Sequence, residues 1–114
     1  MRRLFGNNIT NDFNGHIELW DVSNVEDMTH MFWQAESFNQ PIGKWNVSNV
    51  NSMYGMFKNA ESFNQPIGKW NVFNVIDMVY MFEDAKTFNQ SLNDWDTSNV
   101  MDMNHMFAGA EQFN

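Results

Sequence analysis

The chain repeats itself every 25 residues, and this repetition constrains the fold more than any single motif does. The segment FNQPIGKWNVFNV at 63–75 is a near copy of FNQPIGKWNVSNV at 38–50. A fixed period of about 20 to 50 residues is typical of chains in which each repeat forms one unit and buries its apolar side against its neighbours. Every side chain in one unit must therefore pack beside its own copy in the next.

Several columns of apolar residues keep this period without a slip, and we expect them to form a shared core. They are Phe13, Phe38, Phe63, Phe88 and Phe113; Trp20, Trp45, Trp70 and Trp95; Val25, Val50, Val75 and Val100; Met28, Met53, Met78 and Met103; Met31, Met56, Met81 and Met106; and Ala35, Ala60, Ala85 and Ala110. The chain has 10 methionines, which we interpret as packing residues because a thioether fills irregular gaps.

The columns divide the chain into repeats at 13–37, 38–62, 63–87 and 88–112, after which the sequence stops within the next copy of the motif. Residues 1–12 match the repeat poorly. We interpret them as a degenerate N-terminal coil or cap, because the ends of a repeat array need atypical units to cover their apolar faces.

Each repeat divides into two halves with different patterns. Pro41 and Gly43 exclude a helix from the first half, whose apolar residues then indicate turns and a short strand. The second half has apolar residues three and four apart, the stripe of a short amphipathic helix, at Val50, Met53, Met56, Phe57 and Ala60. The sequence therefore predicts a right-handed α/β repeat solenoid of about four coils, with short parallel strands and short helices.

Asparagine also falls into columns. One contains Asn24, Asn49, Asn74 and Asn99, and another contains Asn39, Asn64, Asn89 and Asn114. An asparagine side chain satisfies backbone groups at tight turns, and a column of them can bond from coil to coil. We interpret both columns as structural.

Composition limits the partners that the chain can bind. The formal net charge is -8, which disfavours nucleic acid and anionic membranes because both require a basic face. A basic or neutral protein partner fits this charge. Cysteine is absent, so the chain has no disulfide or thiolate metal site. The N-terminal residues lack the continuous apolar run of a signal peptide, and we expect no membrane insertion.

With these motifs in view, the sequence resembles the 25-residue repeats of BspA-like leucine-rich-repeat surface proteins, which are abundant among mycoplasma lipoproteins. The resemblance covers about residues 13–114 and rests on FNQPIGKWNVSNV, the segment Asp77, Met78, Met81 and Phe82, and the triplet Ala85, Phe88 and Asn89. It implies leucine-rich-repeat-like coils, an adhesin-type function at the cell surface or outside the cell, and no catalytic residues. Such relatives carry signal peptides and often anchors, which this sequence does not display, so a location in a virion or the cytoplasm stays open.

A catalytic site is disfavoured, because it needs residues in surroundings unlike the rest of the chain, whereas repetition gives each residue similar copies in the other units. No catalytic triad or phosphate-binding loop is evident, and we expect neither enzymatic activity nor a cofactor. His30 and His105 share a repeat phase but lie three coils apart, too far to ligate one metal ion.

An acidic column allows two interpretations. Asp77 and Asp102 are expected to be vertical neighbours, and a calcium ion could bridge them with oxygen ligands from Asn74 or Asn99. The interpretation we prefer is that each aspartate, Asp27 included, stabilises the first turn of its own helix, since Ser52 interrupts the column. No metal site is therefore assigned.

Positions at which the copies differ are the most informative for function, because the shared core does not require a particular residue there. Phe73 replaces a serine of the other copies, and an apolar cluster forms beside it on the helical interpretation. We expect a protein-binding patch at Trp33, Tyr54, Phe73, Ile76, Val79 and Tyr80. Packing of these residues against a loop or a second copy is the alternative.

The alternative function belongs to a different class. In this alternative the chain is a structural component of an assembly such as a virion, a surface layer or a larger complex. In that case the open end of the stack would mediate self-association through the C-terminal coil.

Overall fold

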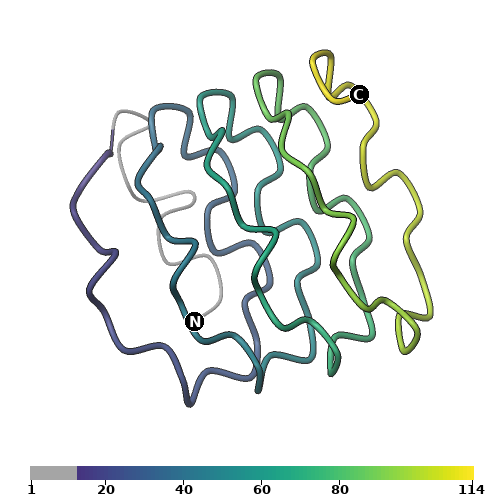
Figure 1. Cartoon of the computed structure of the whole chain (residues 1–114). Coiled ribbons are helices and arrows are strands. Elements are labelled where there is room, and N and C mark those ends of the chain that lie inside the picture. The colour runs from purple at the N-terminus through teal and green to yellow at the C-terminus, as the bar shows by residue number, and fades with distance from the viewer. Residues whose placement is uncertain (1–12) are drawn as a thin grey trace.

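The computed structural model describes residues 13–114. Figure 1 shows the repeats as loops that lie side by side from the purple to the yellow end of the described chain. The chain has a radius of gyration of 12.6 Å and extents of 34 × 30 × 21 Å. The cap predicted at residues 1–12 lies outside the described residues.

The secondary structure differs from the prediction. Residues 13–114 contain no α-helix and no extended strand. The only residues in this range that form β-bridges are Asp27, Ser52, Asp77 and Asp102. Consecutive members of this set are joined by three isolated parallel bridges. The predicted α/β solenoid is therefore wrong, since the described chain is compact and consists mostly of turns and coil.

Each unit is a series of β-turns instead. A turn closes when the N–H of its fourth residue donates to the C=O of its first. In the second unit such turns span Ile42–Trp45, Val47–Val50, Met53–Met56, Phe57–Ala60 and Ala60–Phe63. Apolar residues stand at both ends of these five turns, so the spacing of three that indicated a helix arises from consecutive turns; an overlapping turn, Gly55–Lys58, has no apolar side chain at either end.

Left-handed residues explain why these turns do not continue as a helix. Gly55 (φ 57°) and Asn59 (φ 61°) each occupy the third position of a turn. A positive φ is required there in a type II turn and interrupts a right-handed helix. The same two columns have positive φ in the other units, at His30, Gln34, Tyr80, Asp84, His105 and Gly109.

The backbone hydrogen bonds alternate in direction along this segment. The N–H groups of Met53, Gly55, Phe57 and Asn59 donate to carbonyl groups of the next unit at 2.8–2.9 Å, whereas their neighbours' N–H groups close turns within the unit. The carbonyl groups of Ser52, Tyr54, Met56 and Lys58 accept from the preceding unit. Along this segment one edge of each unit therefore presents donors and the opposite edge presents acceptors, whereas just before it the N–H groups of Asn51, Ile76 and Met101 donate to the preceding unit.

Two ranks of phenylalanine rings fill the interior. In one rank Phe32, Phe57, Phe82 and Phe107 stack at 5.4–5.5 Å between centroids, with interplanar angles of 3–8°. The second rank, Phe13, Phe38, Phe63, Phe88 and Phe113, stacks at 6.0–6.1 Å. The valine, methionine and alanine columns of the two central units are fully buried around these rings. The predicted core is confirmed there, although Trp20 and Met103 are exposed.

Both asparagine columns bond from unit to unit, which confirms their structural role. The N–H groups of Asn39, Asn64, Asn89 and Asn114 each donate to the Oδ1 of the asparagine one unit earlier, at 2.9–3.2 Å. In the other column the Nδ2 groups of Asn49, Asn74 and Asn99 donate to backbone carbonyls of the preceding unit, at 2.7–2.8 Å. Tryptophan Nε1 groups add a third ladder, from Trp45, Trp70 and Trp95 to the carbonyls of Ile17, Ile42 and Ile67.

We predict that Gly43→Ala destabilises the fold. A Cβ at residue 43 would collide with the carbonyl oxygen of Pro66 in the next unit, and a backbone atom cannot move aside as a side chain does. The free energy of unfolding, measured by urea denaturation, should fall by about 1–3 kcal/mol, the usual effect of overpacking. Asn93 has the same repeat position in the fourth unit and already carries a side chain, so Asn93→Ala is the control and should change little.

The asparagine ladder generates a second prediction. Asn64→Ala removes the oxygen that accepts from the Asn89 N–H at 2.9 Å and from the Gln90 side chain at 3.0 Å. The Gln90 side chain would keep its bond to the Asn64 carbonyl at 3.2 Å, so the free energy of unfolding should fall by about 0.5–1.5 kcal/mol, the usual net value of the hydrogen bonds lost. Asn114→Ala is the matched control, because Asn114 donates to Asn89 only through its backbone. Equal effects of the two substitutions would contradict a role for the side-chain ladder.

Candidate functional site

Five aromatic side chains form one continuous row across the units, here called the aromatic row: Trp33, His30, Tyr54, Tyr80 and His105. Neighbouring ring centroids in this order lie 5.4, 5.3, 5.6 and 5.5 Å apart. The last three contacts are edge-to-face, an arrangement that aromatic pairs favour. The first four side chains are partly buried and His105 is exposed. The row thus presents ring edges and faces to solvent while its backbone is fixed by the turns.

Two neighbouring residues position the row. The ammonium group of Lys58 lies 4.7 Å from the ring centroid of Tyr80 and 3.4 Å from a carboxylate oxygen of Glu83. Gly55 occupies the column of Tyr80, and a Cβ there would lie 2.8 Å from Nε2 of His30 and closer still to Cδ2 of the same ring. The absence of a side chain at Gly55 therefore lets His30 contact Tyr54 directly.

Half of the predicted patch lies in the aromatic row. Trp33, Tyr54 and Tyr80 all belong to the aromatic row, and Val79, partly buried, accepts a hydrogen bond from the Gly55 N–H beside it. Phe73 and Ile76 are 46% and 47% exposed, but no ring contact joins Phe73 to the row within the described residues. Ring contacts therefore join three of the six residues to the row, and the patch as a whole stays a prediction.

Sequence reasoning missed three residues near the predicted patch. His30 and His105 were considered only as metal ligands, although their shared phase with Tyr80 was a signal that they extend an aromatic column. Met101, 85% exposed, continues the column of Ile76, and its N–H donates to the Ile76 carbonyl at 2.8 Å. Ile76 and Met101 thus form an apolar strip separate from the row.

A polar cleft of about 370 Å³ lies beside the row, lined by Asp27, Thr29, His30, Ser52, Tyr54 and Asp77. The acidic column caps turns in this cleft rather than helices, so the preferred interpretation needs correction. Oδ1 of Asp27 accepts from the Thr29 N–H at 2.9 Å, and Oδ1 of Asp77 accepts from the Val79 N–H at 3.0 Å. Within residues 13–114, no group of three or more His, Cys, Asp or Glu residues is placed to hold a metal ion.

Asp21 and Asp96 have similar capping roles on exposed turns. Their carboxylates accept hydrogen bonds from the hydroxyls of Ser23 and Ser98, at 2.6 and 2.7 Å, and from the N–H groups of the same serines. These bonds, the hydroxyl bond first, hold the pKa of each aspartate below its ordinary value. The lowered pKa values thus reflect turn formation.

No helix in residues 13–114 could span a lipid bilayer.

Comparison with known proteins places the chain in a family. No match was found among curated proteins or among solved structures. One family matches over residues 1–114, the whole chain, and it is a mycoplasma-type repeat family. The chain therefore belongs to the family described as "Mycoplasma protein of unknown function, DUF285".

Proposed function

We propose that this chain is a non-catalytic protein-binding module, and that the aromatic row contacts the partner. The observation that carries the proposal is a continuous row of five partly or fully exposed rings across successive units. Tyrosine and tryptophan are enriched among the residues that dominate protein interfaces, because they offer a large contact area at a low cost in side-chain entropy.

The backbone below the row supports a preorganised surface. His30, Tyr80 and His105 have left-handed conformations, and the N–H groups of His30 and Tyr80 donate to the next unit at 2.9 and 3.1 Å. A surface whose backbone is fixed before binding loses less entropy on association. The row thus suits a flat or shallowly curved protein partner.

Family membership and charge refine the proposal. The mycoplasma-type family is consistent with the resemblance to BspA-like surface repeats, from which we infer an adhesin-type role at the cell surface. A net charge of -8 favours a partner with a neutral or basic surface, since complementary fields accelerate association.

The repeats themselves supply variants that test the row. Tyr80→Gly places at residue 80 what the second unit has at residue 55, and glycine suits the φ of 58° there. Against a partner identified from an array of purified cell-surface and matrix proteins, this variant should bind at least about tenfold more weakly in surface plasmon resonance, because ring anchors contribute 1.4 kcal/mol or more.

The control is the double variant Phe73→Ser and Ile76→Asn, which restores residues found at these positions in the second unit, Ser48 and Asn51. It should keep its affinity if the row alone carries binding. Unchanged binding by Tyr80→Gly, with unfolding by urea showing a folded protein, would contradict the assignment to the row.

A second candidate function is edge-mediated assembly, and the donor edge favours it. In the last described unit the N–H groups of Met103, His105, Phe107 and Gly109 correspond to those that cross to the next unit elsewhere, and they have no partner within residues 13–114. Beside them Met103, Met106, Phe107 and Ala108 line an apolar hollow with His105. Such an edge pairs with acceptors, so we infer that a second copy would associate with it head to tail.

This candidate predicts the mode of self-association. Two donor edges cannot bond to each other, so light scattering across about 10 μM to 1 mM should show a mass that rises without a plateau at the dimer. Appending one further repeat with a polar outer face should abolish the rise. A concentration-independent monomer, or a closed dimer, would exclude head-to-tail assembly.

A further inference from the structure

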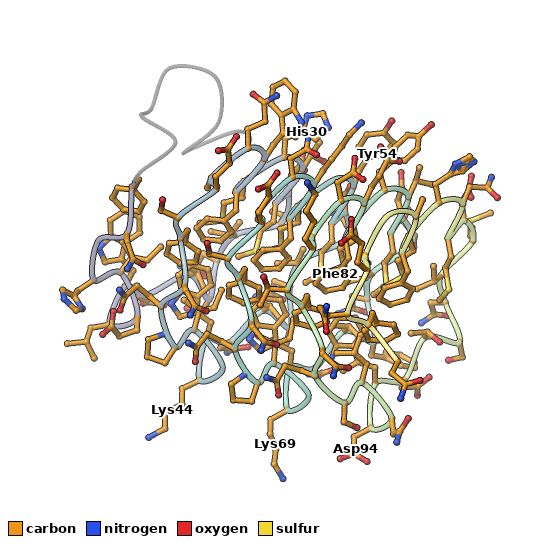
Figure 2. The ribbon with its side chains drawn as sticks, turned by 90° about the horizontal axis from the view of Figure 1, so that it is seen from above. His30, Lys44, Tyr54, Lys69, Phe82 and Asp94 are labelled. Carbon is orange, nitrogen blue, oxygen red and sulfur yellow. The ribbon has the colours of Figure 1, made fainter. Side chains whose placement is uncertain are left out.

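A groove of about 540 Å³ lies on a different side of the molecule from the aromatic row. It is lined by Glu18, Leu19, Pro41, Gly43, Lys44, Pro66 and Lys69. Figure 2 shows Lys44 and Lys69 projecting from one side, in line with Asp94, while His30 and Tyr54 lie on the opposite side. Ligands of the two surfaces would therefore not compete for space.

The floor of the groove is apolar and rigid. Pro41 and Pro66 occupy the same position in the second and third units, directly before the turns that begin at Ile42 and Ile67. Leu19, 94% exposed, borders them from the first unit. Proline rings lose little entropy when a ligand packs on them, so this floor is preformed for an apolar side chain.

The rim of the groove carries the cations of the described chain that have no ion pair. Residues 13–114 contain lysine at 44, 58, 69 and 86. Lys58 pairs with Glu83 and Lys86 with Glu61, whereas Lys44 and Lys69 form no ion pair within this part of the chain. Because they stand one unit apart in the same column, their mutual repulsion is relieved when an anion binds between them.

Acidic residues limit where that anion can bind. Asp94 follows Lys69 in the same column, in the fourth unit, and Glu18 lies at the first-unit end of the groove. Oε1 of Glu18 is buried without a hydrogen-bond partner in the described structure, while Oε2 lies 3.4 Å from Nδ1 of His16. Because Oε1 is not exposed to solvent, it offers a ligand no acceptor, and the charge of Glu18 restricts an anion to the stretch between Lys44 and Lys69.

We propose that this groove binds a peptide segment of a protein partner in which an acidic side chain stands next to an apolar one. The carboxylate lies between Lys44 and Lys69, and the apolar side chain packs on Leu19 and the two prolines. A polyanion such as nucleic acid does not fit, because Glu18 and Asp94 repel phosphates beyond the two lysines. The segment thus combines the anion and the apolar group that the groove accepts.

The test is an NMR titration of the full ¹⁵N-labelled chain. The probe is an acetylated tetrapeptide amide of alternating leucine and glutamate, compared with its counterpart of alternating leucine and glutamine. The acidic peptide should shift the amide resonances of Gly43, Lys44, Gly68 and Lys69 at lower concentration than the neutral peptide. Its affinity should fall when the salt concentration is raised, because partly exposed charges are screened.

Variants separate the groove from other surfaces. The double variant Lys44→Gln and Lys69→Gln should weaken binding of the acidic peptide by about fivefold or more and leave the neutral peptide unchanged. Lys86→Gln, which removes a paired lysine elsewhere, and Tyr80→Gly, which alters the aromatic row, should both bind the acidic peptide as the parent chain does. Equal affinity of the two peptides, or shifts confined to residues of the aromatic row, would overturn the proposal.

Discussion

The fold depends on how each unit divides its backbone hydrogen bonds between itself and its neighbours. In residues 53–59, every second N–H crosses to the next unit, and the N–H groups of Met56 and Lys58 between them close turns within their own unit. Left-handed residues at Gly55 and Asn59 turn the chain so that this alternation can occur. Without it, this segment could neither bend around the stacked phenylalanine rings nor bond to its copies in the adjacent units, and only the asparagine and tryptophan ladders and the bonds near Asn51 would join the units.

The sequence predicted which residues pack but not the backbone that carries them. Columns such as Phe57 and Met53 identify the core because burial follows the repeat, whatever the local conformation. The helix prediction failed because a spacing of three is shared by helices and by consecutive β-turns. The sequence did contain evidence for turns at Gly55, Asn59, Asp84 and Gly109, since glycine, asparagine and aspartate adopt a positive φ more readily than other residues do.

The candidate sites were predictable to different degrees. Comparison between copies found Tyr54 and Tyr80 because they depart from the repeat, but the register that brings rings from three columns into one row depends on the turns. Lys44 and Lys69 were overlooked for the opposite reason. They belong to the repeated framework, and only the arrangement of ion pairs distinguishes them from Lys58 and Lys86.

The donor and acceptor edges of each unit also bear on how such a chain can change its length. Each internal junction uses the same set of backbone bonds, so inserting or deleting one whole repeat leaves every remaining junction intact. An insertion of a single residue within 53–59 would instead exchange crossing N–H groups for turn-closing ones throughout the rest of that segment. Duplication of entire repeats is therefore the route by which this family can gain surface without losing its core.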